Sequence, residues 1–105
     1  MKILFLGDIV GPSGCDAIKK NLKNIINREK IDFVIVNGEN AAAEGVGITE
    51  NITNEILSCN VDVITTGNHV WDQKETVEHI EKEKKLLRPY NLTNPAPGKG
   101  FEVFV

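Results

Sequence analysis

The sequence predicts an α/β fold built from parallel βαβ units. Short apolar runs of strand length alternate with stretches whose apolar residues recur at helical spacing. The connections between the apolar runs are long enough for the crossovers that parallel strands require. With 105 residues, 41% of them hydrophobic, the chain has the size of one ordinary domain. We therefore expect residues 1–105 to form a single α/β domain.

The first half of the chain predicts a strand, a helix and a second strand. Residues 2–7 form an apolar run ended by glycine, which is typical of a strand buried on both faces. Ser13 with Asp16 resembles a capping box, so a helix is expected to begin there. Its apolar residues fall at i, i+4, i+7 and i+8 counted from Ile18, on one helical face. Residues 32–37 give the second strand.

The second half continues the alternation of helices and strands. Thr49 is the predicted N-cap of a second helix, and residues 61–65 form the third strand. Asp72 with Glu75 is another capping box, which predicts a helix from there to about Lys84. Helices between strands of this kind indicate a parallel sheet.

Composition excludes several classes of protein. The chain carries 15 Asp and Glu against 12 Lys and Arg, a formal net charge of -3, whereas a protein that binds a nucleic-acid groove normally presents a basic face. No apolar run could span a membrane and no signal-peptide pattern opens the chain, so we expect a soluble, cytoplasmic protein. Cys15 and Cys59 lie far apart without CxxC spacing, which favours buried thiols over a disulfide.

Polar side chains follow each of the three predicted strands. The strand ends read Gly7-Asp8, Gly38-Glu39-Asn40 and Gly67-Asn68-His69. The carboxyl ends of parallel strands meet at one edge of the sheet, where ligands bind in such folds. A glycine at each end permits a sharp turn that directs the following side chain across this edge. The side chains expected to converge there are Asp8, Glu39, Asn40, Asn68 and His69.

These side chains favour metal-assisted chemistry. Carboxylates packed together repel one another unless a proton or a cation joins them. Asp8, Glu39, Asn40 and Asn68 are ligand types that suit a divalent ion such as Mn²⁺, Fe²⁺ or Mg²⁺. Two such ions about 3.5–4 Å apart can clamp the attacking and leaving oxygens of a phosphoryl transfer. His69 directly follows a predicted ligand, a position that fits a general acid beside the substrate.

The motifs resemble those of the calcineurin-like metallophosphoesterases, and in particular their YmdB-like branch. The residues that carry the resemblance are GDIVG at 7–11, NGEN at 37–40, GIT at 47–49, GNHVWD at 67–72, LLRP at 86–89 and PGKG at 97–100. They occur in the family's order and cover essentially the whole chain. The resemblance implies that the fold is the N-terminal half of a metallophosphoesterase α/β sandwich.

What the resemblance implies about function is a di-metal phosphodiesterase acting on cyclic nucleotides, with 2′,3′-cyclic monophosphates as the substrate class. Carried over by position, Asp8, Glu39 and Asn40 belong to the first metal's environment, and Glu39 bridges the two ions. Asn68 binds the second metal, and His69 protonates the leaving alkoxide. The implied cofactors are two divalent ions, Fe or Mn ahead of Mg, and the implied partner is a small-molecule phosphodiester.

The same resemblance raises the question of completeness. The family takes further metal ligands from histidines in a C-terminal half, whereas this chain has two histidines, and His79 is expected on a solvated helix face. The second metal site is therefore expected to be incomplete. Residues 101–105 predict a final strand with no later element to cover it. We expect an N-terminal part, incomplete or inactive alone, with a separately encoded C-terminal half or a second copy as partner.

Two alternatives remain open from the sequence. Residues 7–14 form a glycine-rich strand–loop–helix, and Glu39 lies where a Rossmann-like module places its ribose-binding acid. The glycine spacing differs from G-x-G-x-x-G, however, and Pro12 removes a backbone donor from the phosphate cradle. The second alternative is a non-catalytic relic or interaction fragment that docks through an uncovered sheet edge.

Overall fold

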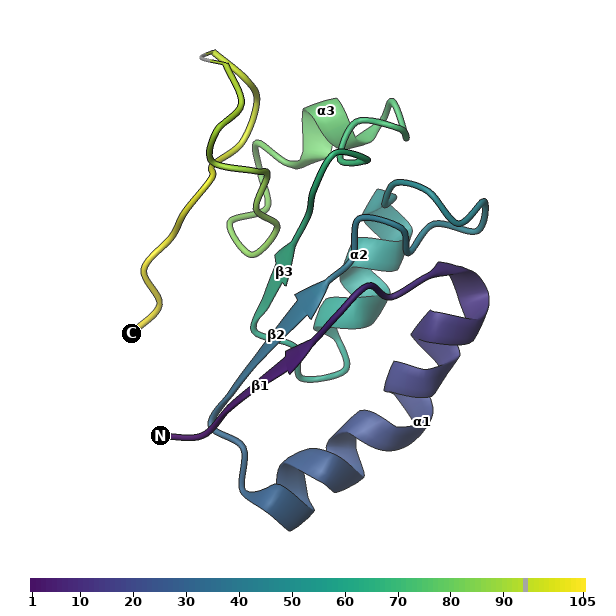
Figure 1. The fold of residues 1–105 in the computed structure, drawn as a ribbon, viewed down its shortest axis with the longest axis vertical. Coiled ribbons are helices and arrows are strands. Elements are labelled where there is room, and N and C mark those ends of the chain that lie inside the picture. The colour runs from purple at the N-terminus through teal and green to yellow at the C-terminus, as the bar shows by residue number, and fades with distance from the viewer. Residues whose placement is uncertain (94) are drawn as a thin grey trace.

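The computed structural model describes residues 1–93 and 95–105, and a three-stranded parallel sheet lies at its centre (Figure 1). The strands are β1 (Ile3–Leu6), β2 (Phe33–Asn37) and β3 (Val63–Thr65), and they lie side by side in the order β1-β2-β3. Both strand pairs are parallel, so all three strands end at the same edge of the sheet. The predicted α/β fold with parallel βαβ units is confirmed.

Two helices form the crossovers and cover one face of the sheet. They are α1 (Gly11–Glu29) and α2 (Glu50–Leu57), which both lie on the right of the strands in Figure 1. The core between these layers combines side chains from the sheet and both helices with those of the following loops. Its buried residues are Cys15, Ile18, Leu22, Val34, Val36, Ala41, Ile48, Ile56, Val61, Ile64, Val70, Ile80 and Leu86.

The opposite face of the sheet is largely open. Ile3 and Phe5 of β1 point to this face and are 57% and 58% exposed. The C-terminal segment reaches it through Phe104, whose ring centroid lies 5.6 Å from that of Phe33. The expectation that the first strand is buried on both faces is therefore wrong, because no second layer of the described chain covers β1 there.

The two long helices begin in different ways. Helix α1 starts at Gly11 rather than at Ser13, and its N-cap Val10 makes no side-chain hydrogen bond, so the predicted capping box is wrong. Pro12 fits within the first turn because the N–H groups there have no partner inside the helix. Helix α2 begins as predicted: the hydroxyl of Thr49 accepts a hydrogen bond of 3.2 Å from the backbone N–H of Ile52.

The third predicted helix is much shorter than expected. Helix α3 spans Thr76–His79 only, and turns replace the predicted continuation to Lys84. Asp72 caps no helix, because its carboxylate contacts His69 instead. His79 was expected on a solvated face, but it is 7% exposed and its Nε2 has no hydrogen-bond partner among the described residues. A single helical turn packed onto the loop before α2 leaves this histidine inside.

The chain after α3 adds one bridge and no further strand within the described ranges. Leu86 forms a parallel bridge with Ile64, with a hydrogen bond of 2.9 Å from the Leu87 N–H to the Ile64 carbonyl. Residues 101–105 belong to no strand, so the predicted final strand is wrong; their contact with the sheet is made by side chains rather than by a backbone ladder. In the part of the chain that the structure describes, no helix is long and apolar enough to cross a membrane.

Replacing the cap of α2 should destabilise the fold. We expect Thr49→Ala to lower the free energy of unfolding by about 1 kcal/mol, because the Ile52 N–H loses its acceptor. Ser13→Ala is the matched control: Ser13 caps nothing, so its effect should stay within about 0.5 kcal/mol. Urea unfolding followed by Trp71 fluorescence measures both. Equal losses in the two variants would contradict the assigned helix starts.

The two free cysteines should differ in reactivity. Cys15 is buried, and burial raises the pKa of its thiol, so less of the reactive thiolate is present at a given pH. Cys59 is only partly buried. We expect iodoacetamide at pH 8 to alkylate Cys15 about tenfold more slowly than Cys59. Peptide mapping by mass spectrometry measures the two rates, and similar rates would contradict the burial of Cys15.

Candidate functional site

Backbone hydrogen bonds bring the three strand ends together. The N–H of Ile9 donates to the carbonyl of Asn37 over 2.9 Å. The N–H of Gly11 donates to the carbonyl of Asn40, also over 2.9 Å. The N–H of Gly38 donates to the carbonyl of Thr65, also over 2.9 Å. These bonds continue the parallel pairing beyond the strands, so the loops that carry the predicted site residues lie next to one another.

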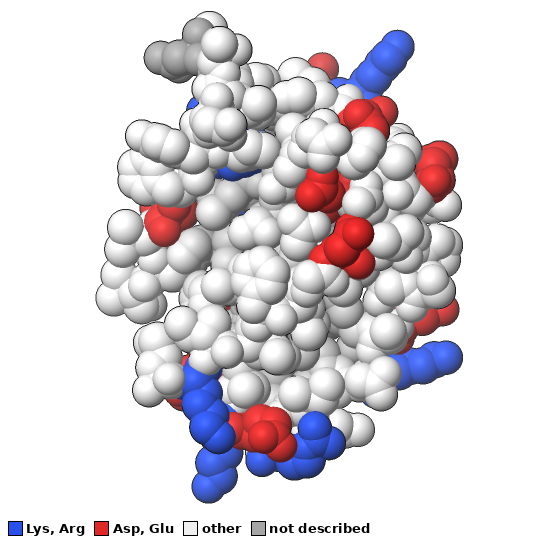
Figure 2. Space-filling model, in the orientation of Figure 1, with Lys and Arg blue, Asp and Glu red and all other residues white. Residues whose placement is uncertain are grey.

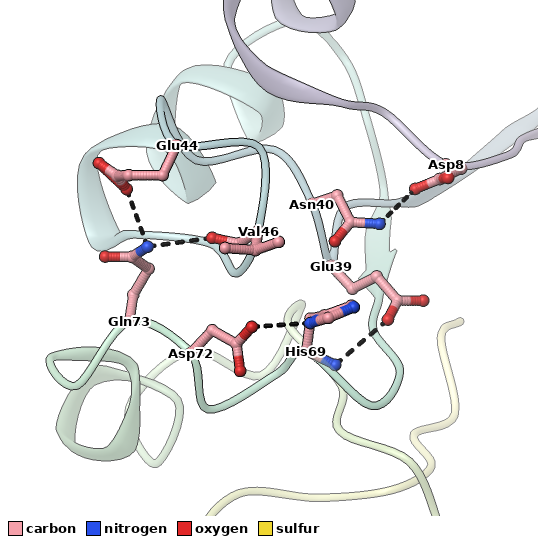
Figure 3. A network of polar contacts seen from close by, with 8 residues as sticks. All are labelled: Asp8, Glu39, Asn40, Glu44, Val46, His69, Asp72 and Gln73. Carbon is pink, nitrogen blue, oxygen red and sulfur yellow. Dashed lines mark hydrogen bonds and ion pairs between the residues drawn. The ribbon is translucent and has the colours of Figure 1, made fainter.

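Asp8 and Asn40 meet across the first two loops. The Nδ2 of Asn40 donates to the Oδ1 of Asp8 over 2.8 Å, as Figure 3 shows. Asp8 has a φ of 35°, a value that a side-chain-bearing residue rarely adopts, and such strain is typical of functional sites. The sharp turn after β1 is thus made at Asp8 itself rather than at Gly7, where we expected it.

Glu39 lies between the second and third loops. Its Oε2 accepts a hydrogen bond of 3.3 Å from the backbone N–H of His69, and its Oε1 lies 3.5 Å from the Nδ2 of Asn37. Gly67 makes this approach possible, since a Cβ there would lie 2.6 Å from the carboxyl carbon of Glu39. Neither Gly67 nor Gly38 has a left-handed φ. Glycine is therefore needed at position 67 because it leaves space for the Glu39 carboxylate, and not because the turn requires a left-handed backbone.

The imidazole of His69 is held by a carboxylate that the sequence reasoning assigned to a helix cap. The Nδ1 of His69 lies 2.7 Å from the Oδ2 of Asp72, and both side chains are a little over one third exposed. The far side of the ring points toward Glu39 and Asn40 (Figure 3). The signal that could have revealed this pair is the i,i+3 spacing of histidine and aspartate within one turn.

Asn68 is the one predicted ligand outside this network. It is exposed at the turn between Gly67 and His69, and it is not among the residues joined in Figure 3. Sequence reasoning also missed Gln73, whose Nε2 donates to the Oε2 of Glu44 over 2.8 Å and to the carbonyl of Val46 over 3.0 Å. This amide ties the loop after Asn40 to the loop that carries His69.

The electrostatics of this edge favour a cation. Neither Asp8 nor Glu39 forms an ion pair with a lysine or arginine of the described chain. On the face shown in Figure 2, acidic side chains gather toward the upper right, the direction in which the strands run, and basic side chains lie mainly at the opposite end. Unpaired carboxylates at one edge attract a positive ion.

The orientation of Asn40 gives an independent indication that a cation fits. Its Oδ1 is buried and has no hydrogen-bond donor within the described residues, while its Nδ2 is occupied by Asp8. A buried oxygen without a donor is unfavourable unless a water or an ion contacts it. Asp8, Glu39 and Asn40 therefore fit part of a divalent-ion shell.

The described part of the chain does not hold a complete shell made of acidic and histidine side chains. No group of three His, Cys, Asp or Glu residues within it converges closely enough to hold a metal ion. Two of the predicted ligands, Asn40 and Asn68, have carboxamide side chains and so do not count toward a group of His, Cys, Asp or Glu.

The geometry does not favour a Rossmann-like phosphate cradle. In such a cradle, the backbone N–H groups of the glycine-rich loop are free to bind a pyrophosphate. Here the N–H groups of Ile9 and Gly11 donate to backbone carbonyls of the second loop. Those donors are thus already used to hold the two loops together.

Comparison with known proteins identifies the family of the chain and agrees with its fold. The family model of YmdB-like proteins matches residues 4–105, and the chain belongs to this family. A relative from Bacillus subtilis (strain 168), a 2′,3′-cyclic-nucleotide 2′-phosphodiesterase, is 44% identical over 100 residues, which are 95% of this chain and 38% of that protein.

Two solved structures are also similar. The crystal structure of a phosphatase from Mycoplasma pneumoniae superposes with a TM-score of 0.88 at 35% identity, over 99% of this chain and 39% of that one. A hypothetical protein from Thermus thermophilus superposes with a TM-score of 0.86 at 37% identity, over 98% of this chain and 40% of that one. The chain thus spans about two fifths of the length of these relatives.

Filling the space at Gly67 should weaken metal binding. We expect Gly67→Ala to displace the Glu39 carboxylate and to reduce the affinity for Mn²⁺ by about 10- to 100-fold. Gly7→Ala is the matched control, because a Cβ at Gly7 meets nothing within 4 Å. Mn²⁺ titration followed by the fluorescence of Trp71, two residues from His69, measures the affinities. Equal affinities in both variants would contradict a ligand role for Glu39.

Proposed function

We propose that the chain provides metal ligands at its three strand ends and the catalytic acid of a metal-dependent phosphodiesterase that hydrolyses 2′,3′-cyclic nucleotides. The observation that carries the proposal is the unsatisfied acceptor group at one edge: within the described chain, the carboxylates of Asp8 and Glu39 lack basic partners, and the buried Oδ1 of Asn40 lacks a donor. The naming of the Bacillus subtilis relative supports the substrate class.

The proposed ligands are Asp8, Glu39, Asn40 and Asn68. Divalent ions held there, Fe or Mn ahead of Mg, supply positive charge next to the phosphate and stabilise the charge that develops on its oxygens. The negative edge formed by the protein alone would repel a phosphodiester, so the substrate needs this charge to approach. The remaining metal ligands are expected from a C-terminal half, which belongs to the same polypeptide or to a separately encoded one, or from a second copy of this chain.

His69 is the proposed general acid. Its backbone is held by Glu39 and its ring is held by Asp72, so the free Nε2 faces the region between the second and third loops. Hydrolysis of a cyclic phosphodiester breaks the bond from phosphorus to a ribose oxygen, which is a poor leaving group as an alkoxide. A proton from Nε2 to this oxygen accelerates the step, typically by about 10²–10⁴-fold.

A chimera tests the proposed function without requiring the isolated chain to be active. This chain replaces the matching 38% of the Bacillus subtilis relative, and turnover of 2′,3′-cyclic AMP is measured with Mn²⁺. We expect the chimera to hydrolyse the substrate and His69→Ala to lower kcat by about 10²-fold or more. Asp8→Asn should raise the Mn²⁺ concentration that gives half-maximal activity.

The matched control is Asp16→Asn, which changes an exposed carboxylate on α1 that lies outside the site. Its kcat and Mn²⁺ requirement should equal those of the parent chimera. A folded chimera that is inactive, or one that keeps its full rate in His69→Ala, would contradict the proposal. The chain alone is expected to show little or no turnover.

A further inference from the structure

The side chain of Asp72 is directed at the one ring nitrogen of His69 that faces away from the proposed substrate region. The contact is 2.7 Å from Oδ2 to Nδ1, a short and charge-assisted geometry. An ionised carboxylate can only accept a hydrogen bond, so Nδ1 carries the proton in this arrangement. The Nε2 on the far side of the ring is then the nitrogen that faces the region between Glu39 and Asn40.

Asp72 is itself anchored. Its backbone N–H donates to the carbonyl of His69 over 3.1 Å, which closes the turn that carries both residues. The next residue, Gln73, holds the loop of Glu44 and Val46 through two hydrogen bonds. A Cβ at Gly47 would lie 3.2 Å from the Cβ of Asp72, so the loop packs directly against it. The turn that carries His69 and Asp72 is thus held by its own backbone hydrogen bond and by the neighbouring loop.

We propose that Asp72 is a positioning residue for His69: it keeps the proton on Nδ1 and thereby reserves Nε2 for the substrate. This inference rests on the proposed function only for its kinetic part. In the reaction, water forms the new bond to phosphorus and gives up one proton to the solvent, the bond to the ribose oxygen breaks, and that oxygen takes the Nε2 proton. The imidazolium becomes the neutral Nδ1–H form, and Asp72 keeps its negative charge throughout.

The first test is spectroscopic and needs no activity. The ¹⁵N shifts of the His69 ring, measured by NMR in metal-free buffer at a pH where the ring is neutral, report which nitrogen carries the proton. We expect the Nδ1–H form in the parent chain and a shift toward the Nε2–H form in Asp72→Ala and Asp72→Asn, because neither variant offers an ionised acceptor. An unchanged tautomer in both variants would overturn the proposal.

The chain supplies its own reference in this experiment. His79 is buried and lines a hollow with Glu50 and Thr53 of α2, so its ring signals should not change in either variant. Glu75→Gln is the matched control, since Glu75 is the predicted partner of Asp72 in a capping box, whereas the hydrogen bonds of His69 to side chains of the described residues go to Glu39 and Asp72. This control should leave the tautomer of His69 as in the parent. Asp72→Asn keeps the shape of the side chain, so a change there reflects charge rather than lost packing.

The second test separates positioning from general damage by changing the leaving group. In the chimera, Asp72→Asn should lower kcat for 2′,3′-cyclic AMP by about 10²-fold or more with little change in KM. Bis-p-nitrophenyl phosphate releases p-nitrophenolate, which leaves without protonation, so its turnover should fall far less. Equal losses for both substrates would overturn the positioning role. An inactive parent chimera would contradict the proposed function, while the NMR result would still decide the tautomer.

Discussion

Three backbone hydrogen bonds that continue the sheet past its strands, at Ile9, Gly11 and Gly38, hold the polar ends of the strands together. Because all three strands are parallel, their carboxyl ends share one edge, and these bonds keep the following loops from diverging. The contact of Asp8 with Asn40 and that of Glu39 with His69 both depend on this arrangement. Two of these bonds, from Ile9 and Gly11, use donors that a nucleotide-binding loop would need, so they do not favour a Rossmann-like phosphate cradle.

The resulting edge combines negative charge, buried acceptors and one oriented imidazole. Carboxylates without basic partners are costly to hold together, and the Oδ1 of Asn40, which has no donor in the described chain, adds to that cost. The Glu39 carboxylate packs against Gly67, where the Cβ of any other residue would clash with it. Local strain at Asp8 points in the same direction. The proposed cation would offset these unfavourable terms by placing positive charge beside the carboxylates and the amide oxygen.

The sequence predicted the sheet, both crossover helices and the meeting of polar residues from the three strand ends at one edge. These features depend on local patterns: apolar runs of strand length, the cap at Thr49, and glycine followed by a polar residue at each strand end. The predictions that were wrong concern residues whose surroundings are set by distant segments. Asp72 satisfies every local rule for a helix cap, yet a histidine three residues earlier takes its carboxylate, and helix α3 is short. His79 is buried for a similar reason, because α3 packs onto another loop.

The sequence by itself determined which chemical groups the chain offers and, through the periodicity of its apolar residues, that parallel strands would bring them to one edge. The tertiary structure decided how these groups are paired. It directed Nδ1 of His69 to Asp72, left Asn68 exposed, and showed that Gly67 leaves room for the Glu39 carboxylate. The physical reason is that strand and helix formation follow from neighbours along the chain, whereas a side chain's partner follows from distances in space between loops far apart in sequence.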